Sequence, residues 1–341
     1  MHPDHQLPVI AVVIPAYMVR NHILDVLSRI GPEVAKIIVI DDACPDRSGA
    51  LVTEAVSDPR VHVHVHPVNL GVGGAVITGY RMAMAAGADI VVKVDGDGQM
   101  PPEFIPALVA PIVTGEADYT KGNRFFNPED VRGMPPIRLF GNAALSLLTK
   151  GSTGYWSIVD PTNGFTAVHA SILPLLRLDR IARRYFFESD LLFRLSLLRC
   201  RVIDVPMAAV YRGETSNLMI GRTAHIFLFA NVANLAKRII YNYFVRGFSI
   251  ASLYLVAAIP LLMFALVYGT IEWVTSIETS IARPTGTVIL VAFLALMGFQ
   301  LLLAFGAHDI SAEPGTAIHP RLRRLQQSLA ILNRHLQPGA P

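Results

Sequence analysis

Residues 90–101 read IVVKVDGDGQMP, an apolar strand that runs directly into two aspartates separated by one glycine. Two carboxylates at this spacing can converge on one divalent cation, and Gln99 adds a neutral oxygen two residues later. Hard oxygen ligands suit Mg²⁺ or Mn²⁺, so Asp95, Asp97 and Gln99 form a predicted metal site. The alternative interpretation is a polar turn that only ends the strand.

The rest of the N-terminal half alternates between short apolar runs and segments with helical spacing of apolar residues. This alternation predicts an α/β fold, in which a mostly parallel sheet carries helices on both faces. In such sheets, ligands bind beyond the carboxyl ends of the strands. Strands are predicted at 9–14, 36–40, 61–65 and 90–94, and helices at 23–30, 47–56 and 71–86.

Polar or glycine-rich residues follow two other predicted strands. Asp41 and Asp42 end the second strand, where an acidic residue commonly binds a ribose or base, or else caps a helix. The stretch from Asn69 to Gly74 opens a helix after the third strand. Its backbone N–H groups are suited either to a diphosphate or to a purely structural turn.

Two further groups of titratable residues have two interpretations each. His62, His64 and His66 share one strand face, which suits a metal site or, by preference, a solvent-facing strand. Glu188 and Asp190 stand near the start of a predicted helix. They are either part of a binding site or carboxylates that compensate the helix dipole.

The C-terminal third is far more apolar than a soluble domain. Hydrophobic residues make up 52% of the chain and charged residues 16%, with a mean hydropathy of +0.45. Residues 247–271 and 284–307 contain no Asp, Glu, Lys or Arg. Since ~20 residues of helix cross a bilayer, both runs are predicted membrane spans rather than buried helices of a soluble core. Two distant cysteines exclude a disulfide scaffold, and a net charge of +3 gives no support for a nucleic-acid partner.

Basic residues flank the two spans, and the loop between them holds two Glu and one Arg. The positive-inside rule therefore places the N-terminal part and the C-terminus in the cytoplasm, and no signal peptide is expected. We predict a multi-pass protein of the inner (cytoplasmic) membrane. The predicted segments are a catalytic domain at 1–218, amphipathic interfacial helices at 219–246, spans at 247–271 and 284–307 around an outside loop at 272–283, and a cytosolic tail with an amphipathic helix at 308–341.

The tail carries leucines at helical spacing from Leu322 to Leu336, with arginines mostly off that stripe. Such a stripe requires an apolar partner. The partner is the catalytic domain, a second protomer or the anionic leaflet, and packing between protomers is favoured, so a homo-oligomer is expected.

Taken in order, the motifs resemble family 2 glycosyltransferases with the GT-A fold. More narrowly, they are similar to polyprenyl-phosphate glycosyltransferases of the dolichyl-phosphate mannose synthase type. The matching stretches are VVIPAY (12–17), IIVIDDACPD (37–46), NLGVGGAVITGY (69–80), VVKVDGDGQMPPEFI (91–105), DYTKGNRF (118–125), DPTNGF (160–165), YFFESD (185–190) and YRGETSNL (211–218).

The resemblance implies roles for the matching positions. Met18 and Val19 depart from the family's usual residues after Pro-Ala-Tyr, which leaves the identity of the nucleotide open. The implied nucleotide-sugar site comprises Pro15, Ala16, Tyr17, Asp41, Asp42, Gly74 and Asp95; the catalytic residues are Asp97, Glu188, Asp190 and Arg124; the acceptor phosphate binds Arg124 and Arg138; and the metal binds Asp95, Asp97 and Gln99.

The implied activity is inverting transfer of a sugar from a UDP- or GDP-linked donor to a polyprenyl (undecaprenyl or dolichyl) phosphate at the inner leaflet, with Mg²⁺ or Mn²⁺. An alternative is a membrane glycosyltransferase with a hydroxyl acceptor, which requires a general base. A non-enzymatic alternative is a membrane-tethered scaffold that binds nucleotide sugars.

Overall fold

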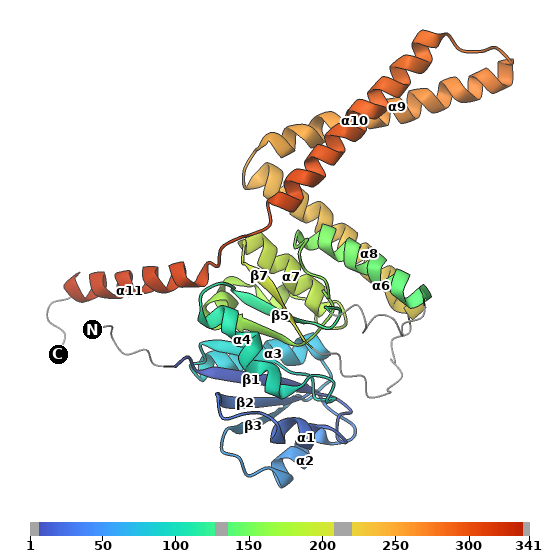
Figure 1. Cartoon of the computed structure of the whole chain (residues 1–341). Coiled ribbons are helices and arrows are strands. Elements are labelled where there is room, and N and C mark those ends of the chain that lie inside the picture. Colours follow the sequence, from blue (N-terminus) through green and yellow to red (C-terminus); the bar gives the residue numbers. More distant parts are fainter. Residues whose placement is uncertain (1–6, 127–135, 208–219, 337–341) are drawn as a thin grey trace. The chain divides into compact units, whose positions relative to one another are not determined.

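The computed structural model describes residues 7–126, 136–207 and 220–336. The chain divides into two compact units, one formed by residues 1–235 and 314–341 and the other by residues 236–313. The first unit contains a seven-stranded sheet in the order β3-β2-β1-β4-β6-β5-β7 (Figure 1). The strands are β1 (Ile10–Ala16), β2 (Val34–Asp41), β3 (Val61–Val65), β4 (Ile90–Lys93), β5 (Tyr119–Asn123), β6 (Thr166–His169) and β7 (Val202–Pro206).

The sheet is mixed but mostly parallel. β1 pairs in parallel with β2 and β4, β2 with β3, and β5 with β7, whereas β6 runs antiparallel to β4 and β5. The carboxyl ends of the other six described strands therefore share one edge of the sheet, where the loop before β6 also arrives. This confirms the predicted α/β fold and places the motifs that follow β1, β2, β4 and β5 at that edge.

Helices cover both faces of the sheet because alternate strand residues point to opposite sides. Val12 and Ile14 of β1 belong to a core shared with α4, whereas Ala11 and Val13 belong to a second core shared with α3 and α7. All four are fully buried. The helices of this unit are α1 (Ile23–Ser28), α2 (Ser48–Ala55), α3 (Val72–Ala85), α4 (Ile105–Val113), α6 (Pro136–Thr153), α7 (Phe187–Leu198), α8 (Ile220–Ile240), whose last residues enter the second unit, and α11 (His319–Leu336).

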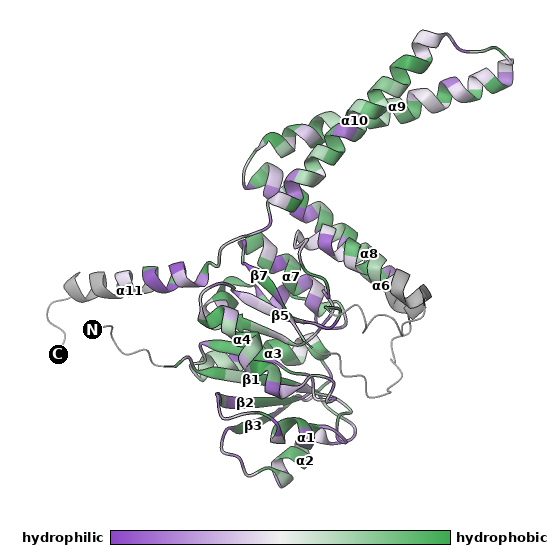
Figure 2. Cartoon of the chain, in the orientation of Figure 1, coloured by the Kyte–Doolittle hydropathy of each residue, from purple (hydrophilic) through white to green (hydrophobic). Residues whose placement is uncertain are grey.

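The second unit is a helical hairpin of α9 (Ile250–Thr279) and α10 (Thr285–Ser311), and both helices are apolar over most of their length (Figure 2). By length and composition, both are long and apolar enough to cross a membrane. Helix α9 continues to Thr279, so most of the loop predicted at 272–283 is helical. The helix outlasts the apolar run because hydrogen bonding along the backbone does not require apolar side chains.

A buried ion pair closes the base of this hairpin. Arg238 binds both carboxylate oxygens of Asp309 through Nη1 and Nη2, at 2.7 and 2.8 Å, and the hydroxyl of Tyr243 donates to the same carboxylate at 2.6 Å. Both charged side chains are at most 4% exposed. The pair therefore links the end of α8 to the end of α10.

Candidate functional site

The turn after β4 presents three oxygen-bearing side chains on one side. Asp95, Asp97 and Gln99 are partly exposed, while the residues between them, Gly96 and Gly98, are buried. Gly98 has a φ of +76°, a conformation that favours glycine, and the backbone N–H of Gln99 donates to Asp97 Oδ1 at 3.0 Å. The turn therefore exposes carboxylate and amide oxygens at the carboxyl edge of the sheet, and these are the ligands that a hard cation prefers.

Lys93, the last residue of β4, joins two carboxylates that are far apart in the sequence. Its ammonium lies 2.7 Å from Asp95 Oδ1 and 3.3 Å from Glu188 Oε1, and it donates to the carbonyl of Gly164 at 3.2 Å. The side chain of Lys93 is 1% exposed, whereas Asp95 and Glu188 are 29% and 14% exposed. The structure thus brings together Asp95 and Glu188, which were predicted as site residues on separate motifs.

The environment of Lys93 keeps it charged. Burial alone would lower its pKa, but the carboxylates of Asp95 and Glu188 outweigh burial and raise the pKa above its ordinary value. A Cβ at position 164 would collide with the Lys93 ammonium, so Gly164 permits this close approach. Our sequence-based prediction missed Lys93, although a lysine within an otherwise apolar strand was the available signal.

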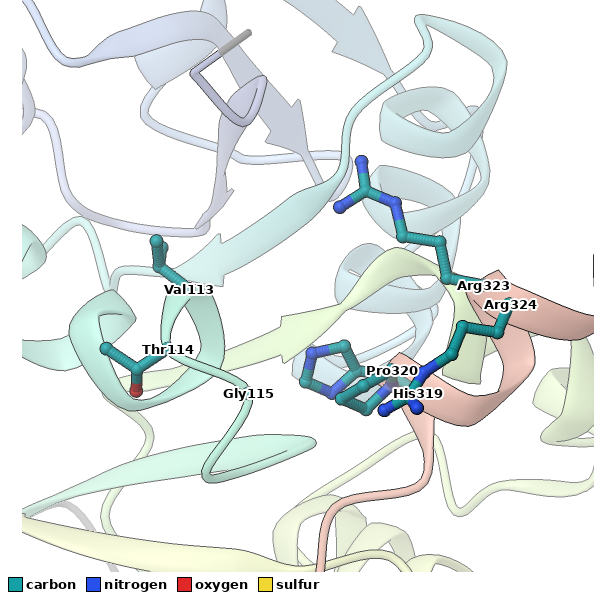
Figure 3. Close-up of a pocket in the computed structure, with 7 residues that line it drawn as sticks. All are labelled: Val113, Thr114, Gly115, His319, Pro320, Arg323 and Arg324. Carbon is teal, nitrogen blue, oxygen red and sulfur yellow. The ribbon is translucent and has the colours of Figure 1, made fainter. Parts of the chain in front are cut away.

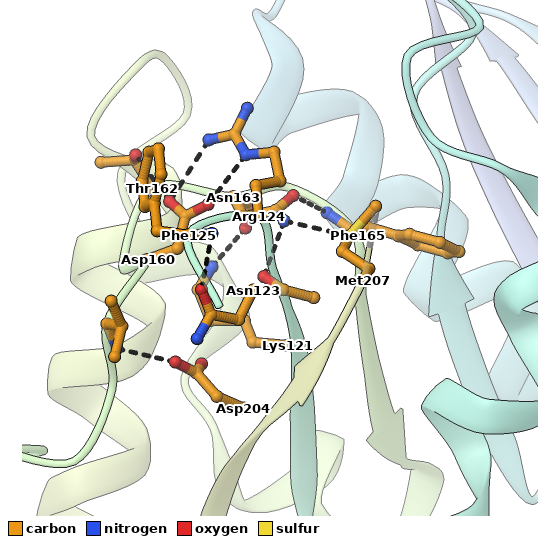
Figure 4. A network of polar contacts seen from close by, with 12 residues as sticks. Lys121, Asn123, Arg124, Phe125, Asp160, Thr162, Asn163, Phe165, Asp204 and Met207 are labelled. Atoms are coloured by element: carbon orange, nitrogen blue, oxygen red, sulfur yellow. Dashed lines mark hydrogen bonds and ion pairs between the residues drawn. The ribbon is translucent and has the colours of Figure 1, made fainter. Parts of the chain in front are cut away.

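A second buried lysine holds the turn that precedes β6. Lys121 of β5 donates to the carbonyl of Asn163, and the Asn163 amide donates to the carbonyl of Gly122 at 2.6 Å (Figure 4). Lys93 and Lys121 therefore bind consecutive carbonyls of the 160–165 turn. Burial lowers the pKa of Lys121 to about 8.

The same turn orients Arg124. Asp160, which is 1% exposed, accepts hydrogen bonds from Arg124 Nε at 2.8 Å and Nη2 at 3.3 Å. The Arg124 side chain, which directly follows β5, is 33% exposed. Arg124 is therefore a fixed cation at the carboxyl edge of the sheet, which is the property that its predicted phosphate contact requires.

Asp204 of β7 lies beside these residues and pairs in register with Lys121 (Figure 4). It accepts a hydrogen bond from the backbone N–H of Val159 at 2.7 Å. Burial raises its pKa to about 6, despite the nearby charge of Lys121. Asp204 was not predicted as a functional residue, and its contacts make it part of the support for the 160–165 turn.

The carboxylates of Asp41 and Asp42 form hydrogen bonds with other groups of the protein. Asp41 accepts from the backbone N–H groups of Cys44 and Gly49, each at 2.7 Å. Asp42 binds His66 Nδ1 at 2.7 Å and accepts from the N–H groups of Leu70 and Gly71. These contacts are structural, although neither aspartate is the N-cap residue of a helix, since Arg47 and Gly71 occupy the N-cap positions of α2 and α3. The predicted nucleoside contact stays a prediction.

The glycine-rich turn before α3 also has internal partners. Gly71 has a φ of +83°, and the N–H of Gly74 donates to the carbonyl of Arg183 at 3.2 Å. The turn packs closely against the segment that leads into α7 and Glu188. Ala16 is buried and Tyr17 is 48% exposed, so within the Pro15–Tyr17 stretch the tyrosine ring is the part most accessible to a ligand.

Asp190 has different surroundings from Glu188. It accepts from the N–H of Ala182 at 2.9 Å and from Arg194 Nε at 3.1 Å, and the amide of Asn234 in α8 lies 3.4 Å away. Two positions along a helix are about 200° apart, so the two carboxylates point to different sides of α7. The Arg138 side chain and the 211–218 stretch lie outside the described residues.

The three histidines in and after β3 have different environments. His62 and His64 are exposed, whereas His66 follows the strand, is buried, and bonds to Asp42 and to Thr78 Oγ1 at 3.0 Å. The described residues contain no cluster of three or more His, Cys, Asp or Glu side chains that could hold a metal ion. The site after β4 has two carboxylates and one amide, which is a different set of ligands.

Comparison with known proteins agrees with this geometry. The model for "Glycosyl transferase family 2" matches residues 11–175. A UDP-N-acetylglucosamine–dolichyl-phosphate N-acetylglucosaminyltransferase from Methanococcus voltae is 30% identical over 62% of this chain and 91% of the relative. This chain belongs to glycosyl transferase family 2. Another relative of this family 2 glycosyltransferase, the undecaprenyl-phosphate mannosyltransferase of Micrococcus luteus, is 33% identical over 61% of the chain and 86% of the relative.

Solved structures show the same fold. A glucosyl-3-phosphoglycerate synthase from Mycobacterium tuberculosis in complex with UDP has a TM-score of 0.50 and 22% identity, and the match covers 68% of this glycosyltransferase and 86% of that chain. The same synthase in complex with phosphoglyceric acid also has a TM-score of 0.50, at 23% identity over 68% and 80% of the two chains. These likenesses establish a GT-A-like fold.

Proposed function

We propose that this glycosyltransferase moves a sugar from a nucleoside-diphosphate sugar to a polyprenyl phosphate at the inner leaflet. The observation that carries the proposal is the meeting of Asp95 and Glu188 on the buried ammonium of Lys93. This contact connects the turn after β4, which is suited to the donor diphosphate, with α7, which is expected on the acceptor side. The choice of acceptor is supported by relatives whose names specify dolichyl or undecaprenyl phosphate.

On the donor side, Asp95, Asp97 and Gln99 fit Mg²⁺ or Mn²⁺ because all three offer hard oxygen atoms on one side of a turn. Lys93 holds Asp95 through Oδ1, which fixes the orientation of this carboxylate. When bound, the cation would stabilise negative charge on the departing diphosphate. Tyr17 and the loops after β1 and β2 would border the nucleoside.

On the acceptor side, Arg124 would bind the acceptor phosphate, and Glu188 would orient the sugar or the acceptor. A phosphate oxygen forms the new bond to the anomeric carbon as the bond from that carbon to the diphosphate breaks, with inversion. The acceptor phosphate is largely anionic at pH 7, since its second pKa is about 6. No side chain therefore has to remove a proton, and a Glu188 held by Lys93 suits positioning.

Helices α9 and α10 would span the membrane, with the catalytic unit and the C-terminus on the cytoplasmic side. Lys237, Arg238 and Arg246 before α9, and the arginines after α10, support this orientation. A membrane location provides access to an acceptor whose long apolar tail lies in the bilayer.

A lipid-extraction assay tests the reaction. The full-length protein in lipid nanodiscs is incubated with radiolabelled UDP- and GDP-sugars and with undecaprenyl or dolichyl phosphate, and the organic phase is then counted. We expect label in the lipid phase with the phosphorylated acceptor and none with the free polyprenol. Transfer to the free polyprenol or to an added glycan would favour the hydroxyl-acceptor alternative, and no transfer with any donor would overturn the proposal.

The metal assignment makes a separate prediction. Asp97→Asn removes one carboxylate charge from the turn after β4, so we expect transfer to fall to near background while the thermal unfolding curve is preserved. Excess EDTA should have the same effect on the wild type, and added Mg²⁺ or Mn²⁺ should restore its activity. Full transfer in EDTA would contradict the assignment.

A further inference from the structure

The first turn of α11 is attached to the catalytic unit. The N–H groups of Ile318 and His319 donate to the carboxylate of Asp118, just before β5, at 2.9 and 2.8 Å. The His319 ring stacks on His169 with 4.2 Å between ring centroids. Ile318 and Leu322 pack against the core beneath α3 and α7. Of the three partners considered for the tail, the start of the helix therefore uses its own catalytic domain.

Beyond this turn, the described part of the apolar stripe of α11 is exposed. Leu325 and Leu329 follow Leu322 at spacings of three and four residues, which places them on the same face of the helix. They are 54% and 58% exposed. A stripe that begins in a protein core and continues into solvent requires a second apolar surface.

The charged residues that flank the stripe are all arginines. Arg321, Arg323 and Arg324 are exposed, and the described part of the chain offers none of them an acidic partner. Arg323 and Arg324 also line a cavity of about 300 Å³ between α11 and the end of α4 (Figure 3). Residues 314–341 contain four arginines and no Asp or Glu.

We propose that α11, beyond its attached first turn, lies on the anionic surface of the bilayer, with Leu325 and Leu329 in the interface and the arginines against lipid phosphates. This pattern of apolar face and basic flanks is that of interfacial helices. A second copy of the helix is a poorer partner because its basic flanks would face like charges. Only residues 312–318 separate α10 from α11, so the helix starts at most about 29 Å from the end of that span. The inference relies on the proposed membrane location and not on the reaction.

An environment-sensitive label tests this contact in the full-length protein. Leu329→Cys is labelled with a nitrobenzoxadiazole dye in nanodiscs of phosphatidylcholine alone or mixed with phosphatidylglycerol. Wild type is the background control, since Cys44 and Cys200 are both buried. Ser328→Cys, an exposed position about 100° around the helix, reports the neighbouring face. We expect a blue shift at position 329 with the anionic lipid, quenching by brominated lipid tails, and a smaller effect at position 328.

Charge variants complete the test. Arg321→Gln, Arg323→Gln and Arg324→Gln together should abolish the shift, as should ~1 M salt, in which the Debye length is only ~3 Å. Arg81→Gln, Arg177→Gln and Arg199→Gln, which remove the same charge elsewhere, should leave the shift intact. An equal signal in both lipids, or one that depends on protein concentration in detergent, would overturn the proposal and indicate a protein seam. Transferase activity in the same nanodiscs separately reports on the proposed function.

Discussion

Lys93 is a buried, charged side chain of the sheet, and it forms ion pairs with both Asp95 and Glu188. Without its ammonium, Asp95 and Glu188 would be two like charges close to one another, and they would repel each other. With it, each carboxylate has one oxygen fixed and the turn at 160–165 is tied to the same point. We therefore regard Lys93 as a positioning residue for both sides of the proposed reaction.

Lys93→Met should reduce transfer strongly and lower the free energy of unfolding by about 3 kcal/mol. This is the low end for a buried ion pair that loses one partner, because Asp95 remains partly hydrated. Combining it with Glu188→Gln removes the repulsion, so stability should partly return while transfer does not. Thermal unfolding and the lipid-extraction assay measure the two effects. Wild-type transfer by Lys93→Met would show that the bridge has no role in the reaction.

Titration of Asp204 should make the stability of the catalytic unit depend on pH. Burial raises its pKa from 3.8 to about 6, so the folded protein binds this proton more tightly than the unfolded chain does. This contribution is therefore favourable at low pH and is lost as the pH rises from about 4 to about 6, by roughly 3 kcal/mol. Asp204→Asn should raise the unfolding temperature at pH 7.5 more than at pH 4.5. Equal shifts at both pH values would contradict the assignment.

The buried Arg238–Asp309 ion pair should contribute to the stability of the α9–α10 hairpin. Asp309→Leu leaves a buried guanidinium without its carboxylate, so we expect a loss of about 3–5 kcal/mol. Adding Arg238→Met removes the unpaired charge, and the double variant should recover most of that loss. In a Trp156→Phe background, fluorescence of Trp273 in α9 reports unfolding of this unit. If the single variant were as stable as the double variant, the pair would have no structural role.

The chain crosses between its two units twice, since α8 leads into the hairpin and the tail returns to the catalytic unit at Asp118. We predict that the catalytic unit folds without the hairpin. Residues 236–313 are replaced with a flexible Gly/Ser linker of about 20 residues, which spans roughly 25 Å. The product should be soluble, unfold cooperatively and bind UDP or GDP in calorimetry. Aggregation of this variant would show that the fold depends on the hairpin.

The alternation of the first four strands with helices, the carboxyl-edge position of Asp95 and the two long apolar helices were predictable from the sequence, whereas β5, β6 and β7 were not predicted. Each predicted feature depends on local periodicity or on a polar residue that follows an apolar run. These patterns can be recognised without knowing which segments pack against one another in the fold. Helix ends were less predictable, as the extension of α9 to Thr279 shows, because a helix can continue past its apolar stretch.

Only the tertiary structure decided which charges are paired. Lys93 and Glu188 are 95 residues apart, and Asp118 and Ile318 are 200 residues apart. Asp42 looks like a ligand-binding carboxylate in the sequence, yet its oxygens bind His66 and the turn at Leu70 and Gly71. The physical reason is that burying a charge is costly unless a partner neutralises it, and that partner comes from whichever segment the fold places beside it.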